Sequence, residues 1–200
     1  MEIKDKELSP EESMQIITQS LSNFKRNYRE KSDYVLLWGY VIALASLTHF
    51  AVLRYLISNE NYTHISLISY LIWGGFVLGG IILQFFKVAR SKDRTLTVSQ
   101  LDRHYRLLWY VAATAIFIIA FICLKFEIYP APFILTIIGF TTMTSGLFIR
   151  FKPLIIGGII FFAFSILMAF VVNEYQLLLN TIAIVAGYII PGYMLRKAKE

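Results

Sequence analysis

Long apolar stretches alternate along the chain with short polar ones. Six of them contain few charged side chains and are close to the roughly 20 residues that an α-helix needs to cross a hydrocarbon core of about 30 Å. These stretches are 34–57, 65–86, 107–124, 133–149, 154–172 and 177–195. The pattern predicts an all-α integral membrane bundle of six transmembrane helices over 34–200, preceded by a cytoplasmic tail, 1–33.

The tail is predicted to contain one amphipathic helix. Ser9, Pro10 and Glu12 supply an N-cap, a proline at the first helical position and a glutamate at the third, which form a capping box. Apolar side chains then recur at alternating spacings of three and four residues, on one face: Met14, Ile17, Leu21, Phe24 and Tyr28. Two interpretations stay open. The face packs on the inner membrane surface or this chain's own cytoplasmic side, or it contacts a partner protein.

Basic residues are distributed unevenly between the two sides that six crossings create. Of the 19 Lys and Arg residues, all except Arg54 and Lys125 lie in the tail, in 87–106, in 150–153 or in 196–200. These four segments fall on one side, and basic residues beside spans stay cytoplasmic. We therefore expect a cytoplasmic N-terminus and C-terminus. The net charge of +6 then reflects topology, and no nucleic-acid partner is expected.

Composition agrees with a membrane protein. The chain is 57% hydrophobic and only 16% charged, whereas soluble domains carry about 25% charged residues. The tail mixes acids with bases and the first apolar run begins at Tyr34, so no cleavable signal peptide is expected. The single cysteine, Cys123, lies within the third span and cannot form an internal disulfide.

Ionisable and strongly polar side chains within a span are functional candidates by default. His49, in the first span, could accept a proton or a ligand, or could be a neutral histidine hydrogen-bonded to a neighbouring helix. Arg54, near the outer surface, could pair with an acidic loop residue or act as a surface anchor. The candidates for a cavity or a ligand contact among spans one, four and six are His49, Arg54, Thr141, Ser145 and Asn180.

Other residues indicate how the helices pack. Gly75 and Gly79 form a GxxxG motif, which lets two helix backbones approach closely. We expect this motif to pack against the chain's own helices, with a homo-oligomer contact as the alternative. Pro191 is expected to interrupt the sixth span and to free a backbone carbonyl.

The second, fourth and sixth spans end alike, with a glycine followed by basic residues, at Gly80, Gly146 and Gly192. Internal duplication explains this similarity, and so does convergence on glycine packing and basic anchors. A separate basic segment, 103–106, directly precedes the third span. It is interpreted as an anchor with an aromatic residue at headgroup level, and a phosphate or nucleotide site is the alternative.

No catalytic, metal or cofactor site is expected, and the chain is predicted not to be an enzyme. Thr144, Ser145 and Gly146 resemble the serine motif of rhomboid proteases, which also have six spans. That chemistry needs a histidine on another span, and the sixth span has none. The sequence also lacks HExxH and has no aspartate within a span.

Several short motifs carry a resemblance: Ser13-Met14, Leu21, Leu37-Trp38-Gly39, Phe151-Lys152-Pro153 and Ile190-Pro191-Gly192. In these the chain resembles an uncharacterised family of short multipass membrane proteins from bacteria, which implies the bacterial cytoplasmic (inner) membrane. Its size and span count also resemble the substrate-binding subunits of energy-coupling-factor vitamin transporters. We expect a non-enzymatic regulatory, sensory or scaffold role, and the alternative is a small transporter or a membrane substrate-binding subunit of one.

Overall fold

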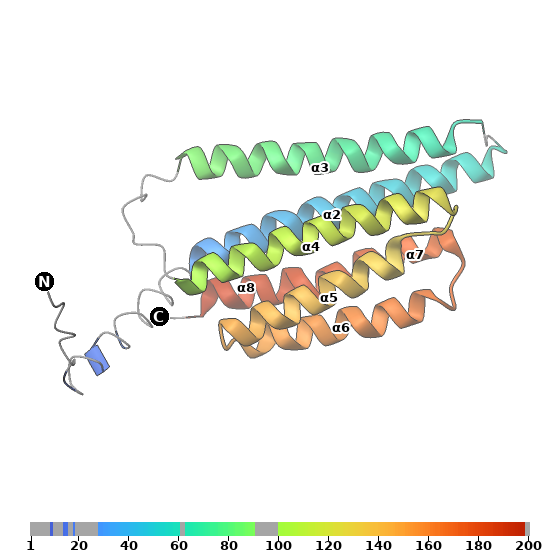
Figure 1. Ribbon diagram of the computed structural model, residues 1–200. Helices are drawn as coiled ribbons and strands as arrows, with labels where there is room; N and C mark the ends of the chain where they lie inside the picture. Colours follow the sequence, from blue (N-terminus) through green and yellow to red (C-terminus); the bar gives the residue numbers. More distant parts are fainter. Residues whose placement is uncertain are drawn as a thin grey trace, which may run out of the picture.

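The computed structural model describes residues 28–60, 63–90 and 100–198, together with Ser9, Met14, Gln15 and Thr18 of the tail. No strand occurs among these residues. The helices, most of them labelled in Figure 1, are α2 (Tyr28–Ser58), α3 (Ile65–Arg90), α4 (Gln100–Lys125), α5 (Ala131–Phe148), α6 (Lys152–Met168), α7 (Asn173–Ile184), the π-helical turn η1 (Val185–Ile189) and α8 (Ile190–Lys197).

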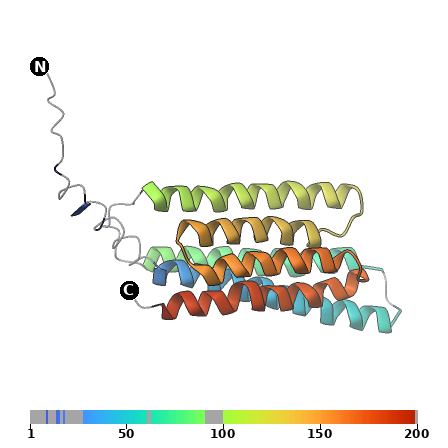
Figure 2. The same ribbon diagram turned by 90° about the horizontal axis from the view of Figure 1, so that it is seen from below.

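The helices run antiparallel to one another in chain order. α7, η1 and α8 follow each other as one rod, so the chain passes up and down the bundle six times. Figure 1 and Figure 2 show that the start of α2 and the end of α8 lie at the same end of the bundle. We call this the basic end, because the helix termini there carry Lys87, Arg90, Arg196 and Lys197.

The all-α fold class is confirmed. Five helices are long and apolar enough to cross a membrane: Ser32–Ser58, Ile65–Arg90, Arg103–Lys125, Ala131–Phe148 and Glu174–Lys197. The remaining apolar helix, Lys152–Met168, has 17 residues and is shorter. Its span was predicted to continue to residue 172, but α6 ends at Met168. The next three backbone N–H groups bond carbonyls three residues back, which marks a turn.

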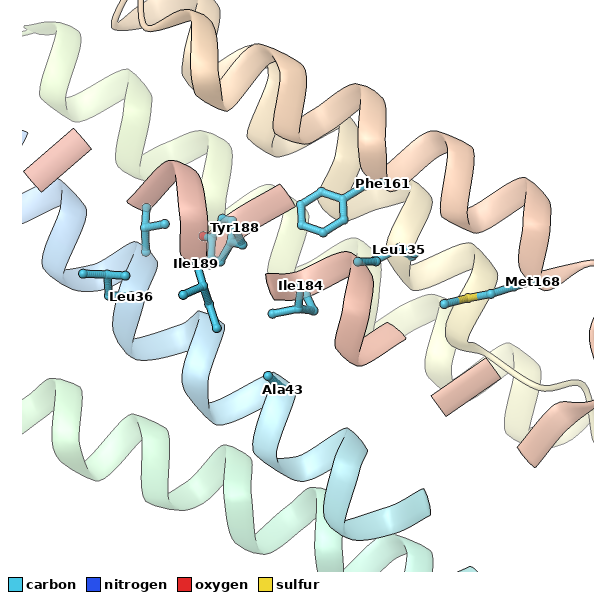
Figure 3. Packing of buried hydrophobic residues seen from close by; sticks show 10 residues of the cluster. Leu36, Ala43, Leu135, Phe161, Met168, Ile184, Tyr188 and Ile189 are labelled. Atoms are coloured by element: carbon cyan, nitrogen blue, oxygen red, sulfur yellow. The ribbon is translucent and has the colours of Figure 1, made fainter. Parts of the chain in front are cut away.

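The buried core lies where α2, α5, α6 and the rod meet. Figure 3 shows this core, with labels on Leu36, Ala43, Leu135, Phe161, Met168, Ile184, Tyr188 and Ile189. Only 6% of the apolar stretch of α3 and 11% of that of α4 are buried, against 50% for the rod. α3 packs mainly on α2, and α4 packs mainly on α5. These two helices are therefore peripheral, and their large apolar faces are suited to contact lipid.

Glycines bring α5 and α6 close together. A Cβ atom added at Gly158 would lie 2.6 Å from the Cβ of Met143, and one added at Gly146 would lie 2.7 Å from the backbone nitrogen of Ile155. Real Cβ atoms do not approach other atoms so closely. Close backbones gain van der Waals contact, which drives helix association in hydrocarbon.

Pro191 interrupts the rod as the sequence predicts. Proline has no amide hydrogen, so the carbonyl of Gly187, four residues earlier, lacks its α-helical donor. The chain adapts through η1, after which the N–H of Ile190 bonds the carbonyl of Val185, five residues back. The Gly187 carbonyl lies against Gly157 of α6, where an added Cβ would collide with its oxygen. The carbonyl that Pro191 leaves without a helical donor thus lies in a close contact between α6 and the rod.

The glycines of α3 do not pack as expected. No atom lies within 4 Å of a Cβ built at Gly74, Gly75 or Gly79. The prediction that Gly75 and Gly79 pack against the chain's own helices is therefore wrong for the part of the chain that the structure describes. The glycine that packs on α2 is Gly80, where an added Cβ would lie 3.2–3.4 Å from side-chain atoms of Val41 and Trp38. The face of α3 with Gly75 and Gly79 and the face with Gly80 belong to one apolar stretch, so composition could not show which of them packs on α2.

Most of the predicted tail helix lies outside the described residues. Met14, Gln15 and Thr18 are helical, and the Thr18 hydroxyl donates to the Met14 carbonyl at 2.7 Å. Met14 is 71% exposed. Of the other members of the predicted apolar face, Ile17, Leu21 and Phe24 are not among the described residues, and Tyr28 is the first residue of α2. The amphipathic helix therefore stays a prediction.

Candidate functional site

The five candidate residues do not share a cavity, because each meets a different part of the structure. His49 contacts α3, and Arg54 of α2 contacts α7. Asn180 of α7 contacts Ser46 of α2, and Thr141 bonds its own helix. The Ser145 hydroxyl is buried within α5 and has no hydrogen-bond partner in the part of the chain that the structure describes. The expectation of one cavity lined by the first, fourth and sixth spans does not hold for His49, which turns toward the second.

His49 is the centre of a polar contact between α2 and α3. Its Nε2 lies 2.8 Å from Ser69 Oγ, and its Nδ1 lies 3.1 Å from the indole nitrogen of Trp73. The Ser69 hydroxyl also donates to the carbonyl of Ile65 at 2.8 Å. The indole N–H can only donate, so Nδ1 must accept, and the ring hydrogen belongs on Nε2, which donates to Ser69. This arrangement selects a neutral histidine with both ring nitrogens paired.

A serine and a histidine at this distance invite comparison with a catalytic pair. A general base for serine needs a free lone pair on the nitrogen that faces the hydroxyl, with its other nitrogen donating to an orienting acceptor. Here Trp73 supplies a donor to His49, which enforces the opposite tautomer. The geometry therefore favours a structural role for Ser69 and His49 over nucleophilic chemistry.

Two further polar contacts join the same pair of helices. The Trp38 indole N–H donates to the side-chain carbonyl oxygen of Gln84 at 2.7 Å, and Lys87 pairs with Asp33 at 3.0 Å. Sequence reasoning missed these partners, but a signal was present. Four residues of α3 recur at spacings of four, seven, four and three around Gly80, which puts them on one helical face: Ser69, Trp73, Gln84 and Lys87.

A second polar contact joins α2 to α7 inside the core. The fully buried Ser46 donates to the carbonyl of Leu177 at 2.8 Å, and the amide of Asn180 donates to Ser46 Oγ at 3.2 Å. Both side chains thus find partners within the protein. In hydrocarbon such pairs hold helices together at about 0.6 kcal/mol each on average.

Arg54 connects the ends of the same two helices that lie away from the basic end. Its guanidinium pairs with Glu174 at 3.1 Å and lies 5.8 Å from the centre of the Tyr175 ring. The Arg54 side chain is half exposed. An ion pair exposed to this degree contributes no more than about 1 kcal/mol. The ion pair with Glu174 agrees with one of the two interpretations of Arg54, and the other, a surface anchor, stays a prediction.

The hydroxyl side chains of α5 differ in their hydrogen bonding. Thr141 donates to the carbonyl of Ile137 at 2.8 Å, four residues earlier, as helical threonines commonly do. The hydroxyls of Thr142 and Ser145 are completely buried and have no hydrogen-bond partner among the described residues. A buried hydroxyl left unpaired costs about 1–3 kcal/mol. Of these two residues, Ser145 was a predicted candidate and Thr142 was not.

Among the residues that the structure describes, no group of three or more His, Cys, Asp or Glu side chains could hold a metal ion. A comparison of the chain with protein families, curated proteins and solved structures finds no match.

Proposed function

We propose that the chain is a multi-pass integral membrane protein with a non-enzymatic regulatory, sensory or scaffold role. One observation supports this most strongly. The polar side chains within the helices mainly fasten helices together, as His49 does for α2 and α3 and Ser46 with Asn180 for α2 and α7. A transport pathway would instead need polar groups directed into a shared space.

The proposed topology has six spans with both termini in the cytoplasm, in a bacterial cytoplasmic (inner) membrane. Counting α6 as a span rests on its apolar sequence and on its place between α5 and the rod (Figure 1, Figure 2). Its 17 residues extend roughly 26 Å, a few ångström less than a typical hydrocarbon core. Local thinning of the bilayer accommodates a difference of this size.

The alternative function is a small transporter or a membrane substrate-binding subunit. The buried, unpaired hydroxyls of Thr142 and Ser145 support it. Thiol accessibility distinguishes the two functions. In a Cys123→Ala background, Ser46→Cys and Ser145→Cys are expected to resist a membrane-impermeant maleimide from both sides. Glu60→Cys, in an exposed turn, is the reactive control. Labelling at residue 46 or 145 would favour transport.

The tail helix is proposed to dock on the inner leaflet or a protein surface through Met14, Ile17, Leu21 and Phe24. Each such side chain contributes on the order of 1.5–3 kcal/mol when fully buried. The change Ile17→Ser with Leu21→Ser should release the helix, so limited proteolysis of inverted vesicles should cleave faster near Lys25. The control Gln15→Ser with Gln19→Ser alters the other faces. Equal rates in all three proteins would show that the helix is not docked.

A further inference from the structure

Six cations at the basic end surround a small apolar cluster. The cluster consists of buried Ile149, Leu154 and Leu195, with Tyr105 and Phe151 packed against them. It joins the start of α4, the turn between α5 and α6, and the end of α8. Each of the six cations lies within two residues of a cluster member: Arg103, Arg106, Arg150, Lys152, Arg196 and Lys197.

Among the residues that the structure describes, no acidic side chain neutralises this positive surface. All six side chains are exposed, and none has an ion pair in the part of the chain that the structure describes. The segments 103–106, 149–154 and 195–198 contain no acidic residue. By contrast, Lys87 at the end of α3 pairs with Asp33, at 3.0 Å. The surface around the cluster is therefore available to an anion.

Helix lengths place the centre of this surface close to the hydrocarbon. α5 has 18 residues and α6 has 17, whereas α2 has 31 and α4 has 26. Figure 1 and Figure 2 show that the α5–α6 turn stops short of the starts of α2 and α4. Exposed Leu147, Phe148 and Ile156 lie next to Arg150 and Lys152 along the chain. Charged groups beside exposed apolar ones match a phosphate with attached acyl chains, and a soluble anion would use only the charges.

Arg150 occupies a backbone position that favours glycine. Its φ is 53°, and the N–H of Phe151 closes the end of α5 onto the carbonyl of Gly146 at 2.8 Å. Helix ends of this type usually carry glycine, because a side chain there is strained. Glu60 and Glu127, the other non-glycine residues with positive φ among those described, are acidic and lie at the opposite end. Of these three residues with positive φ, the one at the basic end is therefore a cation and the two at the opposite end are anions.

We propose that the α5–α6 turn, with the adjoining ends of α4 and α8, binds the headgroup of an anionic phospholipid. Arg150 and Lys152 contact the phosphate, Arg106 and Arg196 flank it, and the acyl chains cover Leu147 and Ile156. Juxtamembrane cations are attracted to anionic lipid, and basic pockets between helix ends bind such headgroups. This site goes beyond the proposed function: it rests on the proposed membrane-spanning bundle, but not on a regulatory, sensory or scaffold role.

Native mass spectrometry of the full chain in detergent, titrated with phosphatidylglycerol or phosphatidylcholine, tests the site. The native protein should retain phosphatidylglycerol preferentially, and Arg150→Gln with Lys152→Gln should weaken that binding on the order of tenfold. The control Lys87→Gln with Arg90→Gln removes two charges from the same end and should retain most of the binding. Equal losses in both variants, or no preference for phosphatidylglycerol in the native protein, would overturn the proposal.

A second variant keeps the test valid if the double variant misfolds. Arg150→Gly relieves the strained backbone, so it should raise the temperature of unfolding while it lowers retention of phosphatidylglycerol. If the variant is more stable but binds the lipid as the native protein does, Arg150 is not part of the site. Displacement of the lipid by millimolar inorganic phosphate would identify a site for soluble anions and would also overturn the proposal.

Discussion

Replacing Gly157 with alanine should strongly destabilise the bundle. The added methyl group would collide with the carbonyl oxygen of Gly187, and a backbone atom in the middle of the rod cannot rotate away as a side chain can. Overpacking of this kind costs about 1–3 kcal/mol, and more where the neighbour is rigid. The expected result is a clear fall in the temperature at which the protein aggregates or loses its monodisperse peak in detergent.

The same substitution on α3 provides the control. Gly75→Ala and Gly79→Ala add the same methyl group where no atom lies within 4 Å. They should leave stability unchanged or raise it, since alanine favours a helix over glycine by up to about 1 kcal/mol. If Gly157→Ala and Gly75→Ala behave alike, the close contact between α6 and the rod is not a main source of stability.

Replacing His49 with leucine should loosen α3 from the rest of the bundle. Leucine fills a similar volume but accepts no hydrogen bond, so the Trp73 indole N–H would lose its partner in apolar surroundings. Leaving such a donor unpaired costs about 1–3 kcal/mol, and α3 has little buried apolar surface to offset the loss. Hydrogen exchange should therefore accelerate in the backbone amides of α3 and stay unchanged in α5 and α6.

His49→Gln separates the structural role from a functional one. Glutamine keeps a carbonyl oxygen and an amide group that can pair with Trp73 or Ser69, so exchange in α3 and stability in detergent should be largely preserved. If this variant folds normally but loses a measurable cellular activity, His49 does more than hold α3. Unchanged exchange in His49→Leu would show that the hydrogen bonds contribute little to the attachment.

The positions of the helices could be predicted from sequence because each apolar stretch is long and its ends carry charges. Arg150 and Lys152, for example, mark the α5–α6 turn. The side that α6 turns to its neighbours could not be predicted. α6 is apolar all round, so no contrast between faces distinguishes the one that contains Gly157 from the one that meets lipid.

The candidate site was only partly predictable for the same reason. His49 was recognised as a polar residue in a span, but its partners Ser69 and Trp73 lie 20 and 24 residues away in the sequence. Only the folded pair α2 and α3 brings them together. Gly80, Gly146 and Gly192 all meet a neighbouring helix, as their shared position near a basic end indicated. Gly75 and Gly79 carry the same residue type and meet nothing.

The proposed bundle has six spans with its basic end in the cytoplasm, and α6 is the helix on which the number of spans depends. Topology reporters fused after residues 60, 128 and 175 test it directly, together with fusions after residues 95 and 200. The first three should read periplasmic and the last two cytoplasmic. If the fusion after 128 is periplasmic but the one after 175 is cytoplasmic and the one after 200 periplasmic, α6 does not cross the membrane, and the six-span account is contradicted.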